Sequence, residues 1–140
     1  MGRLLIILSL FFAGGALAAP KRVAVLPLKS GDAMTTSEVK YLTDVVREGA
    51  MRALPQGKFI VMTQENLQAL LPPGKTLADC IGECAVQTGK NLKAHYVVTG
   101  EAVKFGRSLR LALRVHVTVT GAMLEQTKLK GASVEDFETG

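Results

Sequence analysis

Cys80 and Cys84 are the two residues of this 140-residue chain best suited to chemistry, and they stand four positions apart in ADCIGECAVQ. A structural disulfide, a redox-active dithiol and a metal site that also uses His95 are all compatible with them. Dithiol enzymes place C-x-x-C at a helix start, and this spacing is one residue longer. A metal site would have three ligands at loose spacing. An even cysteine count favours a disulfide in an oxidising compartment.

Helix geometry limits how such a bridge can form. Side chains four residues apart on a regular helix keep their Cβ atoms about 5–6 Å apart, whereas a disulfide needs about 3.5–4.5 Å. We therefore expect Cys80 to lie outside regular helix, with Gly82 allowing the turn and a helix beginning near Glu83.

A second group of candidate residues lies on one alternating segment. Leu109 to Thr120 alternates apolar residues with Arg110, Arg114 and His116. Such alternation is typical of a strand with one buried and one solvated face. We treat these three polar residues as a candidate surface for a partner or an anion. The alternative is that they are only the solvated side of a sheet.

The remaining polar residues lack the spacing that catalysis requires. The acidic residues form no paired-carboxylate pattern, and the serines lie in no nucleophile-elbow sequence. The glycines are dispersed, and the Lys-Ser/Thr ending of a phosphate-binding loop is missing. The sequence therefore predicts a protein that is not an enzyme and that uses no metal or cofactor.

The first 18 residues, MGRLLIILSLFFAGGALA, have the layout of a secretory signal peptide. Arg3 precedes an apolar run, and small residues lead to a cut expected after Ala18. Cleavage leaves 122 residues and lowers the formal net charge from +5 to +4. No cysteine follows the cut, so lipidation there is not expected. We therefore expect a periplasmic protein, either free or associated with the outer membrane. Export argues against nucleic acid as a partner and for an envelope protein or an anionic envelope surface.

The elements that must position these residues follow from periodicity and turn signals. Thr35 and Glu38 form a capping-box pattern, and Gly49 on the apolar face of the helix predicts close approach to a sheet. The expected strands are 21–28, 59–62, 96–105, 109–119 and 123–130, and the expected helices follow Thr35, follow Thr63 and cover 85–93. The order strand-helix-strand-helix-helix-strand-strand-strand predicts an α+β fold, a mixed sheet of about five strands with helices packed on one face. This domain spans 19–132, and 133–140 is the start of a C-terminal helix or a frayed tail.

The segments RVAVLPL, FIVMTQENLQALL and NLKAHYVVTGEAVKFGRSLRLALRVHVTVTGAML resemble the amino-terminal domain of TolB. They are also similar to the related envelope proteins CsgG, LpoB and FlgO. The resemblance covers Lys21 to Gly131 and implies a protein that acts by contact, as an adaptor, an activator or a pore subunit. This chain departs from the family by lacking the propeller of TolB, the lipidated cysteine of CsgG and LpoB, and a long barrel-forming insertion.

The resemblance and the export signal together predict a non-catalytic protein-interaction module of the bacterial periplasm, and they are compatible with either a monomer or an oligomer. Two alternatives stay open. One is a periplasmic thiol-disulfide enzyme that uses Cys80 and Cys84. The other is a subunit of an outer-membrane secretion assembly.

Overall fold

The structure is a computed structural model that describes residues 18–77 and 84–138. Nearly all of the expected signal peptide, 1–18, lies outside these residues, and its cleavage stays a prediction. No helix of the described parts has the length and apolar character needed to cross a membrane.

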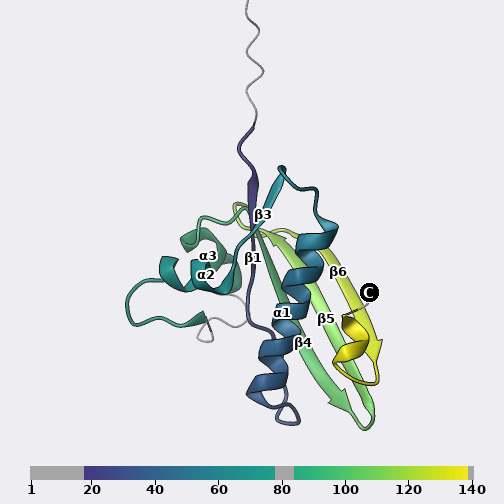
Figure 1. Cartoon of the computed structure of the whole chain (residues 1–140). Helices are drawn as coiled ribbons and strands as arrows, with labels where there is room; N and C mark the ends of the chain where they lie inside the picture. The colour runs from purple at the N-terminus through teal and green to yellow at the C-terminus, as the bar shows by residue number, and fades with distance from the viewer. Residues whose placement is uncertain (1–17, 78–83, 139–140) are drawn as a thin grey trace, which may run out of the picture.

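A mixed sheet forms the centre of the molecule (Figure 1). Its strands are β1 (Lys21–Val25), β2 (Lys29–Ser30), β3 (Phe59–Val61), β4 (Tyr96–Phe105), β5 (Ser108–Val117) and β6 (Met123–Gly131). The order across the sheet is β3-β1-β4-β5-β6, and β2 pairs with β4 beside β1. The β3-β1-β4 part is parallel and β4-β5-β6 is an antiparallel meander. The predicted α+β class and mixed sheet are confirmed.

Three helices pack on this sheet: α1 (Thr36–Ala53), α2 (Gln64–Leu70) and α3 (Cys84–Asn91). The Thr35–Glu38 capping box that begins α1 is formed as expected. The side chain of Thr63 likewise accepts from the N–H of Asn66 at the start of α2.

The expectation that the helices share one face is wrong. Val23 and Val25 of β1 pack in the cluster that includes residues of α1. Ala24 and Leu26 pack instead in a cluster with Leu67 of α2 and with residues of α3. Successive side chains of a strand point to opposite faces, so α1 covers one face while α2 and α3 cover the other. The physical reason is that KRVAVLPL is apolar on both faces and needs cover on both.

Gly100 and Gly89 lie where neighbouring elements approach too closely for a side chain, whereas Gly49 does not. A Cβ added to Gly100 of β4 would lie 2.5 Å from Leu28 Cδ2 and 2.7 Å from Leu113 Cδ2. A Cβ added to Gly89 of α3 would lie 2.6 Å from Thr118 Cγ2. At Gly49 it would meet nothing within 4 Å. The close approach predicted at Gly49 is therefore wrong, and that part of α1 faces a hollow.

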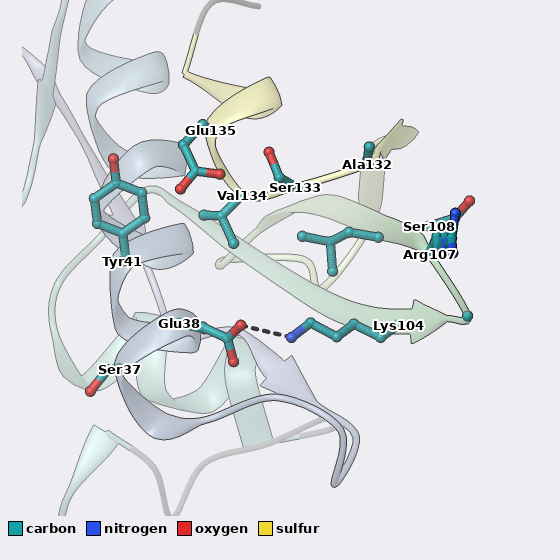
Figure 2. Close-up of a pocket in the computed structure, with 12 residues that line it drawn as sticks. Ser37, Glu38, Tyr41, Lys104, Arg107, Ser108, Ala132, Ser133, Val134 and Glu135 are labelled. Carbon is teal, nitrogen blue, oxygen red and sulfur yellow. Dashed lines mark hydrogen bonds and ion pairs between the residues drawn. The ribbon is translucent and has the colours of Figure 1, made fainter.

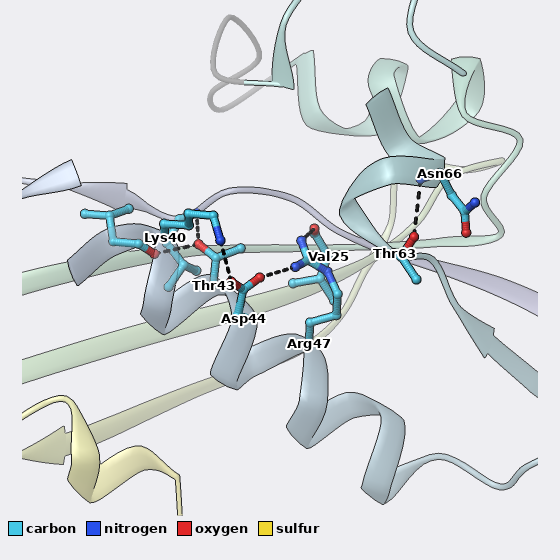
Figure 3. Close-up of polar contacts among 9 residues, drawn as sticks. Val25, Lys40, Thr43, Asp44, Arg47, Thr63 and Asn66 are labelled. Carbon is cyan, nitrogen blue, oxygen red and sulfur yellow. Dashed lines mark hydrogen bonds and ion pairs between the residues drawn. The ribbon is translucent and has the colours of Figure 1, made fainter. Parts of the chain in front are cut away.

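Polar groups of α1 hold the helix against the end of β1 (Figure 3). The hydroxyl of Thr43, which is 4% exposed, accepts from the N–H of Leu28 (3.1 Å) and donates to the carbonyl of Val39 (2.8 Å). The guanidinium of Arg47 pairs with Asp44 and donates to the carbonyl of Val25 (3.3 Å). These contacts satisfy buried backbone groups where the chain leaves β1.

The expected C-terminal helix is a single 3-10 turn, Glu135–Phe137, in the described part of the tail. The carboxylate of Asp136 accepts from the backbone N–H groups of Ala132 (2.6 Å) and Ser133 (3.1 Å). Phe137 and Val134 pack against the cluster under α1. The turn thereby attaches the tail to the end of β6.

Candidate functional site

The face of β4, β5 and β6 that points away from α1 carries a row of basic side chains. Leu109 and Leu111 of β5 pack in the cluster under α1, so Arg110, Arg114 and His116 point to the opposite face. The register places Lys130 opposite Arg110 and Lys128 opposite Ala112. We name this surface the basic open face, and its charged members are Lys29, Glu101, Arg110, Arg114, Lys128 and Lys130.

Helices leave this surface largely uncovered. Among the β4 residues on this face, Val97 at the beginning of the strand packs in the cluster with α2 and α3. Farther along the strands, Glu101, Arg110, Lys128 and Lys130 are all exposed. Five cationic side chains and one carboxylate leave a net charge of +4 over the described residues of the face. A field of this sign attracts carboxylates or phosphates.

A shallow hollow of about 450 Å³ lies within the basic open face. Its lining includes Glu101, Phe105, Arg110, Lys128 and Lys130. The Phe105 ring is 60% exposed, and the Arg110 guanidinium carbon lies 5.3 Å from its centroid. A cation over an aromatic face at this range is an attractive pair, and it orients a planar group that can bind a carboxylate through two parallel hydrogen bonds.

The structure brings the predicted Arg110 and Arg114 onto one surface, while His116 differs from them. His116 is half-buried, and its Nδ1 is a buried atom with no hydrogen-bond partner in the structure. It lies nearer the covered end of the sheet, opposite Val97. Our sequence interpretation missed Lys128 and Lys130, although Gln126, Lys128 and Lys130 alternate along the expected strand in the same way.

The cysteine pair cannot be placed as a site. Cys84 begins α3, one residue after the expected helix start. Cys80 lies outside the described residues, so the predicted bridge stays a prediction. His95, the third ligand in the metal hypothesis, accepts a hydrogen bond at Nδ1 from the N–H of Arg22 (3.0 Å). Within the described ranges, no cluster of His, Cys, Asp and Glu is arranged to hold a metal ion.

A larger hollow of about 650 Å³ lies between the first turn of α1, the β4–β5 turn and the tail (Figure 2). Glu38 and Lys104 point toward each other across its floor, with 2.7 Å between Oε1 and Nζ. The hydrogen bond from Lys104, together with that from the Thr35 backbone, lowers the pKa of Glu38 from its ordinary 4.5 to about 2. Because both charges are already paired, we interpret them as a clamp between α1 and β4.

No protein-family model and no curated protein matches this chain. Solved structures do match it. The C-terminal domain of LpoB from Escherichia coli is 21% identical, with a TM-score of 0.58, over 85% of this chain and 87% of that one. The lipoprotein GNA1162 from Neisseria meningitidis is 14% identical, with a TM-score of 0.62, over 80% of each chain.

TolB from Acinetobacter baumannii is 13% identical, with a TM-score of 0.52 over 85% of this chain. The match spans only 25% of that TolB chain. At these identities the likeness concerns the fold. The resemblance to TolB and LpoB that the sequence predicts is confirmed as a shared fold.

Proposed function

We propose that this protein is a non-catalytic interaction module of the bacterial cell envelope, and that it binds a partner protein through the basic open face. The observation that carries the proposal is the set of five cations on an uncovered sheet face. If this sheet face were apolar, we would expect helices to cover it, because an apolar face must be buried against another element. A charged row there keeps the face solvated and leaves it accessible to an acidic surface.

The arrangement of the groups favours binding by contact. Arg110, Lys128 and Lys130 lie side by side on a shallow surface and do not converge on one enclosed point. Charges set out in this way steer an oppositely charged protein and fix its orientation. A reaction centre, in contrast, requires a nucleophile or a base held against a reacting atom.

The fold neighbours support the same class of function. LpoB, the lipoprotein GNA1162 and TolB share this architecture, and the family resemblance implies an adaptor or activator that acts by contact. Placement in the periplasm rests on the signal-peptide pattern of 1–18. A fold shared at low identity permits many functions, so the surface residues of this chain carry the argument.

The test is a charge reversal on the face in intact cells. We expect Arg110→Glu combined with Arg114→Glu to change the net charge of the described face from +4 to zero and to weaken cross-linking to envelope neighbours by at least tenfold. Mass spectrometry of the cross-linked products names the neighbours. Loss of capture should be mimicked by raising salt, because the contacts are exposed.

The matched control reverses two exposed lysines elsewhere, Lys58→Glu with Lys75→Glu. It changes the net charge of the whole chain equally but leaves the basic open face intact. We expect the control to retain its neighbours. Equal capture by the Arg110/Arg114 variant and the wild type would remove the basic open face from the function, and cytoplasmic neighbours alone would remove the envelope assignment.

A further inference from the structure

Strand β6 is the free edge of the sheet beside the basic open face. It is nine residues long and ends the strand order at β5-β6. Every residue from Met123 to Lys130 is exposed, and within the described residues no strand pairs with its outer side. A long exposed edge presents unpaired N–H and C=O groups to another strand.

The hydrogen-bond pattern identifies which backbone groups point outward. The N–H of Thr118 donates to the carbonyl of His95, and antiparallel pairs alternate between bonded and non-bonded types. Even-numbered residues of β5 therefore bond to β4, and odd-numbered ones, such as Leu111, bond to β6. Since Leu111 pairs with Leu129, the backbone groups of Gln126, Lys128 and Lys130 point away from the sheet.

The two faces of this edge differ in character. The side chains of Lys128 and Lys130 lie on the basic open face, about 7 Å apart along the strand. On the other face, Leu129 is 43% exposed and lies beside a hollow of about 290 Å³. That hollow is lined by small or apolar residues of α1, including Gly49 and Ala53, and by Thr127 of β6.

We propose that an extended segment of the partner adds to β6 as a further strand, with acidic side chains at alternate positions. This inference rests on the proposed function and names the shape and chemistry of what is bound. The outward N–H and C=O groups of Gln126, Lys128 and Lys130 pair with the backbone of the segment. Its carboxylates lie beside the two lysines, and its intervening apolar side chains lie beside Leu129 and the hollow.

Charge distinguishes this occupant from a second copy of the chain. Antiparallel pairing of two β6 strands would bring the Lys128 and Lys130 rows of both copies onto one face. Like charges on adjacent strands are destabilising. The same lysines that oppose self-association favour an acidic strand, so they provide attraction to one class of partner and repulsion of another.

A labelled peptide tests the proposal on the whole protein. The probe is Glu-Val-Glu-Val-Glu-Val-Glu with blocked ends, and its control has the same composition with the glutamates placed together. We expect the alternating peptide to bind more tightly by about tenfold in fluorescence anisotropy. It should also slow hydrogen exchange at the amides of Gln126, Lys128 and Lys130.

A proline substitution removes one outward N–H without changing charge. Gln126→Pro should weaken the binding of the alternating peptide by about tenfold. One backbone hydrogen bond is lost, and the proline ring protrudes from the free edge where the peptide would pair. Edge strands tolerate proline where its N–H would face solvent, and circular dichroism checks that folding is intact. Gln126→Val keeps the N–H, and we expect it to bind as the wild type does.

Each other outcome overturns the inference. Equal binding of the two peptides, or of Gln126→Pro and the wild type, would assign recognition to charge alone. If Arg110→Glu with Arg114→Glu weakened the cross-linking to envelope neighbours while Gln126→Pro left it unchanged, the proposed function would survive and strand addition would be wrong. A wild-type dimer that Gln126→Pro dissociates in light scattering would assign the edge to a second copy.

Discussion

The hydroxyl of Thr43 is the polar contact whose removal has the clearest expected consequence. Thr43 is 4% exposed, and its hydroxyl accepts the N–H of Leu28 at 3.1 Å. Leu28 is itself 5% exposed and connects β1 to β2. Thr43→Val keeps the shape and branching of the side chain but removes the acceptor (Figure 3).

The magnitude follows from what is left unpaired. Because a valine methyl fills the space of the hydroxyl, no cavity forms. The cost is the desolvation of the Leu28 N–H with no partner, about 1–3 kcal/mol. Loss of the hydrogen bond from the Thr43 hydroxyl to the Val39 carbonyl adds little to this cost. Such a bond to the carbonyl four residues earlier competes with the helix's own backbone hydrogen bond and stabilises the helix little. We expect a loss of about 2 kcal/mol, which lowers the melting temperature by roughly 6–10 °C.

The assay is chemical and thermal unfolding, together with hydrogen exchange at Leu28. The exchange rate of the Leu28 amide should increase more than the rates of neighbouring amides, because the Leu28 N–H has lost its hydrogen-bond acceptor. Thr127→Val makes the same chemical change at an exposed position of β6, and we expect it to stay within about 0.5 kcal/mol of the wild type. A Thr43→Val protein as stable as the wild type would refute the reasoning.

Two further predictions concern glycine packing and acid stability. Gly100→Ala should cost about 1–3 kcal/mol, since its Cβ would lie 2.9 Å from the carbonyl oxygen of Ala112 as well as against two leucines. Gly49→Ala should instead stabilise α1 by about 0.5–1 kcal/mol, and urea unfolding compares the two. The pKa of Glu38 is lowered in the folded state to about 2, so its contribution to stability is complete above pH 4.5 and is lost as pH falls toward 2. Glu38→Gln should flatten this part of the stability curve, and a curve that keeps its slope would contradict the role of the Lys104 pair.

Periodicity was sufficient to predict the strands of the meander. Tyr96–Phe105 is the expected strand to the residue, and β5 and β6 differ from the expected ranges by one or two residues. Alternation over ten residues and the turn at Gly106 leave little freedom in where these strands begin and end. The first strand was predicted too long, because 21–28 is uniformly apolar and carries no mark of the break between β1 and β2.

Placement in three dimensions was less predictable. A uniformly apolar strand does not say which helix covers which of its faces, so α2 and α3 were assigned to the face of α1. A glycine in a helix likewise does not distinguish close approach from open space. Gly100 makes the close contact, and in the sequence it is only one small residue in an alternating strand.

The sequence indicates only some members of the surface that we propose as the site. Alternation within one strand is enough to predict that Arg110 and Arg114 share a face. Lys128 and Lys130 belong to the same surface only through the register of β5 with β6. Lys29 joins it through the parallel pairing of β2 with β4. The sequence predicts that these strands follow one another, but it does not give the residue-by-residue register that places the lysines on the face of Arg110.

The lengths of the elements explain why the basic open face exists. Helix α1 has 18 residues and extends about 27 Å, which is close to the roughly 33 Å of the ten-residue β4 and β5. Helices α2 and α3 have only seven and eight residues, about 10–12 Å each. They cover the side of β1 and the beginning of β4, and no described element covers the rest. An uncovered sheet face must carry polar groups or be occupied by a partner. Beyond Val97 the charged residues of this face are five cations and one carboxylate, Glu101, and the face is therefore solvated with a net positive charge. The short second helical layer therefore leaves the basic open face uncovered, and this is the face at which we propose that an acidic partner binds.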